Sequence, residues 1–168
     1  MKWSQLKHRI KQLISPEIRD RVDFYVTRYH EAHDQEGEFW ITIDKQTIFS
    51  GSYYQVLKTL SANEELKEAY YSFPSQRTSV KIENITLEKV VNMGIHDMED
   101  FSQSLFNYLN TPFEESLVSN NPLFKAFALV DSRLGKRRFE KIIIKDDTHE
   151  LIKHFYNLRA SSFKLSEN

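Results

Sequence analysis

The stretch from Arg21 to Ser50 reads RVDFYVTRYH, EAHDQEG, EFWITID and KQTIFS, and it decides the fold class. Two alternating runs rich in aromatic and β-branched residues are followed by a shorter third run, with polar turn signals between them. Such a pattern predicts three consecutive antiparallel strands, a β-meander. Asp44-Lys45 marks the second turn. Because lysine is a poor residue for positive φ, we expect a loop longer than two residues there.

Apolar residues on both sides of the meander recur at helical spacing. We expect an amphipathic helix that ends before Pro16, another after Gly51, and a series of helices in the last third. The expected helix starts are Asp97 with Asp100, a capping box at Thr111 to Glu114 with Pro112 at the first helical position, Asn121 before Pro122, and Asp147 with Glu150.

The middle of the chain is less regular. Residues 64–71 and 86–93 are expected to be helical, with Gly94 ending the second helix in the left-handed conformation. Residues 75–86 give no clear pattern. The whole pattern predicts an α+β fold, with an antiparallel meander of about three strands packed against a predominantly helical C-terminal two-thirds. We expect residues 1–168 to form a single domain.

Composition excludes several classes of function. The chain has 168 residues, enough to bury a core, and its net charge of -1 argues against non-specific attraction to nucleic acids or membranes. The sequence has no cysteine, which excludes a disulfide framework, a thiolate nucleophile and a cysteine-based metal site. The N-terminus lacks the apolar run of a signal peptide and no segment approaches transmembrane length, so we expect a cytoplasmic protein with no membrane association.

The first loop of the meander carries possible metal ligands, namely His30, His33 and Asp34. The helical zinc motif places its histidines four residues apart, whereas these two are three apart and follow a predicted strand. Two imidazoles and one carboxylate could still bind a metal in a loop, as in a metal-dependent hydrolase. The other interpretation is a solvated hairpin loop in which Asp34 makes local turn hydrogen bonds.

Trp40 is a second candidate, because with Tyr25 or Tyr29 it could form an aromatic platform of the kind that stacks on single-stranded nucleic acids. The strand register decides whether these residues share a face. The alternative is that they belong to the core beneath a covering helix.

The densest basic cluster follows the predicted helix that begins after Asn121. It comprises Arg133, Lys136, Arg137 and Arg138, and is extended by Lys141. If a new helix begins here, its backbone N–H groups could join the cations in binding a phosphate. Asp131 and Glu140 lie within pairing range of the cluster, so the alternative is a solvated corner between two helices, with Gly135 required for the bend.

Motifs of the common catalytic classes are missing from the sequence. It contains no Gly-x-Ser-x-Gly, no phosphate-binding glycine-rich loop and no Rossmann fingerprint, and has four glycines in all. We therefore predict no cofactor and assign no catalytic residue.

Five short words run in order along the chain: WSxLK from Trp3, HDQEG from His33, WITxD from Trp40, LGKRR from Leu134 and FYxLR from Phe155. Together they resemble a family of small bacterial cytosolic proteins that is functionally uncharacterised. Lys45 departs from the family pattern, which tends to have glycine there. The resemblance implies a bacterial cytosolic protein and transfers no catalytic residue.

The sequence thus favours a non-enzymatic binding or regulatory protein whose ligand is a protein partner or a phosphate-bearing molecule. Nucleic acid is less favoured because the net charge is close to zero. Two alternatives stay open: a metal-dependent hydrolase-like enzyme using His30, His33 and Asp34, and an immunity-type protein that inhibits a co-encoded toxin.

Overall fold

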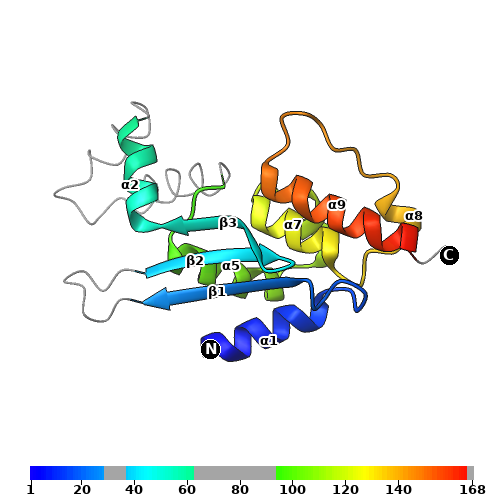
Figure 1. Cartoon of the computed structure of the whole chain (residues 1–168), viewed down its shortest axis with the longest axis horizontal. Coiled ribbons are helices and arrows are strands. Elements are labelled where there is room, and N and C mark those ends of the chain that lie inside the picture. The colour runs from blue at the N-terminus through cyan, green and yellow to red at the C-terminus, as the bar shows by residue number, and fades with distance from the viewer. Residues whose placement is uncertain (29–36, 63–93, 166–168) are drawn as a thin grey trace.

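A computed structural model describes residues 1–28, 37–62 and 94–165, and these form an α+β structure, as the sequence predicts (Figure 1). The described elements, in chain order, are α1 (Trp3–Leu13), β1 (Val22–Arg28), β2 (Gly37–Ile43), β3 (Gln46–Ser52), α2 (Tyr53–Ala62), α5 (Met98–Asn110), α6 (Phe113–Val118), α7 (Pro122–Val130), α8 (Lys136–Phe139) and α9 (Glu150–Leu165).

The predicted meander is confirmed. The three strands are antiparallel in the order β1-β2-β3. Tyr25 of β1 lies opposite Trp40 of β2, which in turn lies opposite Ser50 of β3. Because side chains alternate between the faces of a strand, these three residues share one face of the sheet.

The second turn of the meander is shorter than the sequence predicts. Ile43 pairs with Gln46, so only Asp44 and Lys45 connect the strands, with φ values of 50° and 68°. Both signs are those that a two-residue type I′ turn requires, and the expectation of a longer loop is wrong. Arg21 donates to both carboxylate oxygens of Asp44, at 2.9 and 2.7 Å, and so connects the turn to the residue that precedes β1.

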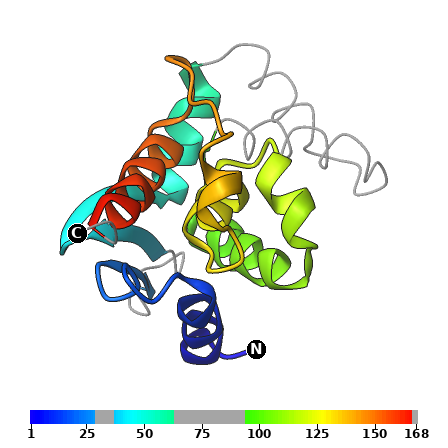
Figure 2. The same cartoon turned by 90° about the vertical axis from the view of Figure 1, so that its right-hand side faces the viewer.

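The inner face of the sheet packs on helices. Phe39 of β2 stacks on Phe101 of α5 with ring centroids 4.1 Å apart, and Phe24 of β1 contacts Phe127 of α7 edge to face at 5.6 Å. Trp3 places α1 beside β1, since its ring lies 6.0 Å from that of Phe24. Figures 1 and 2 show α5 on one side of the sheet, with no described helix crossing the other side in front of β1 and β2.

Two backbone hydrogen bonds join the C-terminal ends of α1 and α7. Ser15 N donates to Val130 O and Ser132 N donates to Leu13 O, both at 2.8 Å. This short bridge fixes the direction in which the chain leaves α7, and it therefore positions the basic residues that follow.

Two of the predicted helix starts are confirmed in detail. Asp97 caps α5, with its Oδ1 accepting from Asp100 N at 2.7 Å. Asn121 caps α7, with its Oδ1 accepting from Leu123 N at 2.9 Å, and Pro122 occupies the first helical position. Both residues supply an acceptor to a backbone N–H that has no partner within the helix.

Two other helix starts differ from the prediction. Pro112 is itself the capping residue of α6, and the Thr111 hydroxyl donates to Asn107 O in the preceding helix instead of capping α6. At the start of α9 the acceptor is not Asp147. Instead, the ring Nδ1 of His149 accepts from Leu151 N at 3.2 Å. Histidine is not one of the common capping residues, so this role could not be predicted from the sequence.

Gly94 has a φ of 79°, which confirms its left-handed conformation. The helices predicted at 64–71 and 86–93, the unassigned segment 75–86 and the loop with His30, His33 and Asp34 lie outside the described residues. None of the described helices combines the length and the apolar character needed to cross a membrane.

Candidate functional site

The cluster of basic side chains predicted from the sequence spans the turn after α7 and the short helix α8, and this basic corner comprises Arg133, Lys136, Arg137 and Arg138. Asp131 caps α7 and turns the chain, since Leu134 N donates to Asp131 O at 3.0 Å. The Arg133 side chain folds back on this turn, with Nε donating to Asp131 Oδ1 at 2.9 Å and Nη2 to Oδ2 at 2.6 Å. Arg133 is thereby held in one orientation, while its side chain is still 45% exposed.

Asp131 is completely buried beneath the corner. Besides Arg133, it accepts a hydrogen bond from the Tyr108 hydroxyl at 2.8 Å. Burial raises the pKa of Tyr108 and the Asp131 charge raises it further, so the hydroxyl remains a donor. The hydrogen bonds to Asp131 likewise raise the pKa of Arg133. The pairing of Asp131 within the cluster, anticipated as a competing interaction, is therefore part of the structure of the corner.

One aromatic ring orders two of the arginines. The guanidinium carbons of Arg133 and Arg138 lie 5.0 and 5.2 Å from the centre of the Phe113 ring. Arg138 also pairs with Glu114, whose side chain is 69% exposed, against 46% for Arg138. Both guanidinium groups therefore contact the Phe113 ring, and one is paired with a buried carboxylate while the other is paired with an exposed one.

The remaining cations of the corner belong to α8, which begins after Gly135. Lys136 is partly buried, whereas Arg137 is exposed and makes no ion pair with any residue that the structure describes. The helix predicted at this point is a single turn, Lys136–Phe139, too short to supply the backbone N–H site that the sequence suggested. Gly135 is not required for the bend, because its φ is -73° and nothing lies within 4 Å of the position of a Cβ.

Arg159 is a buried residue that hydrogen-bonds to the backbone of the turn between α7 and α8, and the sequence did not identify it as a site residue. It is only 5% exposed, and its Nη2 donates to Leu134 O at 3.1 Å. Its Nη1 lies 3.5 Å from Glu17 Oε2, and its guanidinium lies over the Phe163 ring. Burial lowers the pKa of Arg159. A signal was present in the sequence, because Arg159 follows Phe155 by four residues and so shares the apolar face of α9.

The structure brings Trp40 and Tyr25 together. Their rings stack with centroids 5.4 Å apart and an angle of 21° between the planes. The Lys7 ammonium lies 4.1 Å from the centre of the Tyr25 ring and pairs with Asp23 at 2.7 Å. Tyr25 is 37% exposed and Trp40 is partly exposed, so this pair lies at the surface of the sheet and not in the core.

The proposed metal ligands His30, His33 and Asp34, like Tyr29, lie outside the described residues. The strand ends that flank their loop, Arg28 and Gly37, lie at the opposite end of the molecule from α8 (Figure 1). Within the described ranges no group of three or more histidine or acidic side chains could hold a metal ion.

A buried histidine is a further polar residue that the sequence did not identify as unusual. His96 is 2% exposed, and neither ring nitrogen has a hydrogen-bond partner among the described residues. Burial and, to a smaller extent, the neighbouring His149 lower the pKa of His96 to about 4. Phe49 lies edge-on to both histidine rings, at 6.5 and 5.6 Å. His96 is therefore a neutral core residue at neutral pH.

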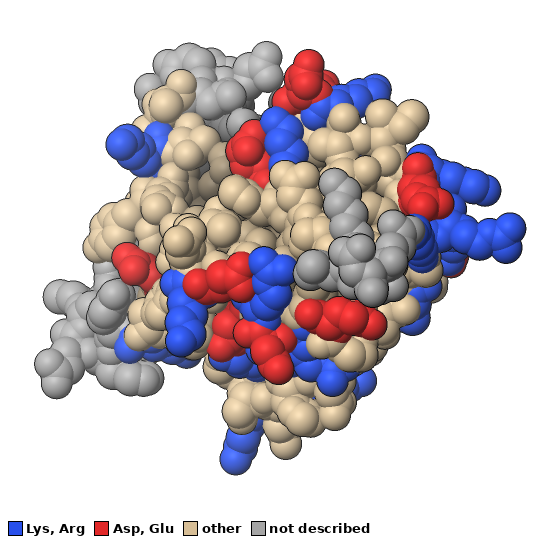
Figure 3. Space-filling model, turned by 45° about the vertical axis from the view of Figure 1, so that its right-hand side comes forward, with Lys and Arg blue, Asp and Glu red and all other residues tan. Residues whose placement is uncertain are grey.

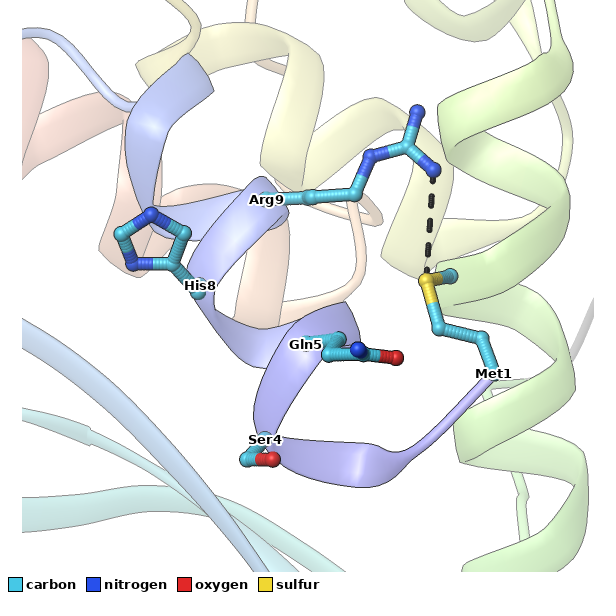
Figure 4. A pocket seen from close by; sticks show the side chains of 5 residues that line it. All are labelled: Met1, Ser4, Gln5, His8 and Arg9. Atoms are coloured by element: carbon cyan, nitrogen blue, oxygen red, sulfur yellow. Dashed lines mark hydrogen bonds between the residues drawn. The ribbon is translucent and has the colours of Figure 1, made fainter.

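Two shallow hollows adjoin the N-terminus. One, of about 490 Å³, lies along the exposed side of α1, where Arg9 Nη1 approaches Met1 Sδ at 3.9 Å (Figure 4). The other, of about 470 Å³, lies between α1 and α5 and includes Asp100. None of the predicted site residues lines either hollow.

Residues 2–160 match the family model described as the SF0329 protein family. The chain belongs to the SF0329 protein family. The matched region includes the meander, the basic corner and Arg159, so every candidate residue lies within it. No curated protein and no solved structure matches the chain.

Proposed function

We propose that this member of the SF0329 protein family is a non-enzymatic binding or regulatory protein that takes a phosphate-bearing ligand at the basic corner. The observation that carries the proposal is the pair of guanidinium groups held over the Phe113 ring, Arg133 at 5.0 Å and Arg138 at 5.2 Å. Guanidinium groups donate planar pairs of N–H bonds that match phosphate oxygens. Because contacts within the protein already restrict both arginine side chains, less side-chain entropy is lost when a ligand binds.

The two arginines have different roles in this proposal. Arg133 is held by a buried carboxylate through Nε and Nη2, and among the described residues its Nη1 group has no hydrogen-bond partner and is offered to a ligand. The partner of Arg138 is the exposed Glu114, and an ion pair in solvent contributes at most about 1 kcal/mol. A phosphate can displace Glu114 at low cost, and Arg137 next to it is free of ion pairs within the described part of the chain.

The charge around the corner favours a single phosphate group over a long nucleic acid. Basic and acidic side chains alternate over the face shown in Figure 3, in keeping with the net charge of -1. Binding along a nucleic acid backbone needs a continuous row of cations, because each neutralised phosphate adds to the affinity. We include a cytoplasmic location and a bacterial origin in the same proposal, on the basis of the resemblance in sequence.

The test is isothermal titration calorimetry of the full chain with inorganic phosphate, with ATP and with a single-stranded oligonucleotide. We expect Arg137→Ala combined with Arg138→Ala to weaken ATP binding by about tenfold or more, since the loss of even one hydrogen bond to a charged group removes about 1.5 to 3 kcal/mol. The matched control is Lys58→Ala combined with Lys145→Ala, which removes the same charge from two exposed positions elsewhere. If the two double variants bind ATP equally, the corner is not the binding site.

A further inference from the structure

The outer face of the meander presents an aromatic pair to solvent. Tyr25 and Trp40 stack on this face, and α5 passes behind the sheet in the view of Figure 1, on the opposite face. None of the described helices crosses this face of the sheet over β1 and β2 (Figure 2). A stacked tyrosine and tryptophan left at a surface offer a large rigid area to a ligand.

The two rings and a cation form a short ladder across the strands. The Lys7 ammonium lies over the Tyr25 ring at 4.1 Å, on the side where α1 flanks β1, and Trp40 lies on the other side of Tyr25, in β2. Both faces of Tyr25 are therefore occupied. The far side of Trp40 is bordered by β3, where its cross-strand neighbour is the exposed Ser50. A side chain as small as serine covers little of that face of the indole, and Trp40 is partly exposed.

The charged side chain next to Trp40 on this face of β2 is acidic. Glu38 precedes Trp40 by two residues and so shares its face of β2, where it is exposed and makes no ion pair with a described residue. The other acid of this face, Asp23, is already paired with Lys7 at 2.7 Å and accepts from the Tyr25 hydroxyl at 2.7 Å. The one unpaired charge of the described outer face near Trp40 is therefore the Glu38 carboxylate.

We propose that Trp40 and Glu38 form a docking site for an arginine side chain of a basic segment in a protein partner. A guanidinium can lie flat on the electron-rich indole face and donate in its plane to a carboxylate, so one side chain satisfies both groups. A nucleobase could also stack on Trp40, but its phosphate would meet the Glu38 carboxylate. This site is separate from the basic corner, and neither proposal depends on the other.

The experiment uses the indole N–H signals of the two tryptophans in a ¹H–¹⁵N spectrum of the full chain. Trp40 reports on the site, and Trp3, packed against Phe24 and Phe101, is the internal control. The probes are capped Gly-Arg-Gly, the same peptide with norleucine in place of arginine, and AMP. We expect the arginine peptide to shift the Trp40 signal with weak, saturable binding, and to leave the Trp3 signal unchanged.

Two variants make the test specific. Glu38→Gln keeps the shape of the side chain and should raise the dissociation constant for the arginine peptide about threefold, the range measured for exposed ion pairs. Glu115→Gln removes the same charge from an exposed position of α6 and should have no effect. The proposal is overturned if norleucine shifts Trp40 as strongly as arginine, or if neither peptide shifts it. It is also overturned if AMP binds and Glu38→Gln strengthens that binding, because the site would then be a nucleobase platform.

Discussion

Replacement of Asp131 by alanine should destabilise the protein far more than the loss of any exposed ion pair. The buried carboxylate accepts from Tyr108, from Arg133 N and from two groups of the Arg133 side chain. Tyr108 is only 2% exposed, so without Asp131 its hydroxyl is buried with neither water nor a protein acceptor. An unsatisfied buried donor of this kind destabilises the folded state by about 1 to 3 kcal/mol.

The Arg133 contribution is smaller, because its side chain is 45% exposed and can be rehydrated; it adds at most about 1 kcal/mol. We therefore expect the free energy of unfolding to fall by about 1 to 4 kcal/mol in Asp131→Ala. Glu114→Ala, which breaks the exposed pair with Arg138, is the matched control and should cost less than about 1 kcal/mol.

Urea denaturation followed by circular dichroism measures both values, provided that the slope with denaturant is unchanged. A double-mutant cycle identifies the cause. If the unsatisfied Tyr108 hydroxyl accounts for most of the lost stability, the effects of Asp131→Ala and Tyr108→Phe should not be additive. The double variant should then be more stable, by about 1 kcal/mol or more, than the sum of the two single losses predicts. An Asp131→Ala variant as stable as Glu114→Ala would refute the reasoning, as would strictly additive effects of the two changes.

Three further predictions concern the meander and its surroundings. First, His96 has a pKa of about 4 when folded and about 6.5 when unfolded, so the unfolded state binds more protons between these values and stability falls as pH drops through this range. His96→Leu should remove about 3 kcal/mol of the loss between pH 7 and pH 4, measured by urea denaturation at each pH, and an unchanged pH dependence would contradict the assignment. Second, Lys45→Gly should raise the free energy of unfolding by about 1 kcal/mol, because the residue has a φ of 68°; a loss of stability would show that Lys45 makes a compensating contact. Third, Gly51→Ala should lower the free energy of unfolding by more than about 3 kcal/mol or prevent folding, since a Cβ there would lie 2.2 Å from a backbone oxygen. Gly135→Ala is the control: a Cβ there meets open space, so the free energy of unfolding should change by less than about 1 kcal/mol, and thermal melts of both variants measure the difference.

Much of the fold could be predicted because it depends on local patterns. The alternation of residues 39, 41 and 43 specifies which face of β2 is buried, and the side chains of Asp97 and Asn121 cap helices within their own neighbourhood of the chain. The basic corner could also be located, since its residues are contiguous. Its character could not be predicted, because the aromatic ring that orders Arg133 and Arg138 comes from Phe113, and the support beneath it comes from Arg159.

The α+β class, the three-strand meander and the position of the basic cluster all follow from the spacing of residues along a few turns or strands, so they could be predicted without the structure. The tertiary structure alone decided which charges are paired and which rings are exposed. Tyr25 and Trp40 share a face only because the strand register places them opposite each other, and Lys45 adopts a positive φ because the pairing of β2 with β3 leaves only two residues in the turn. These outcomes depend on contacts between residues distant in the chain, and such contacts form only when the whole core is packed.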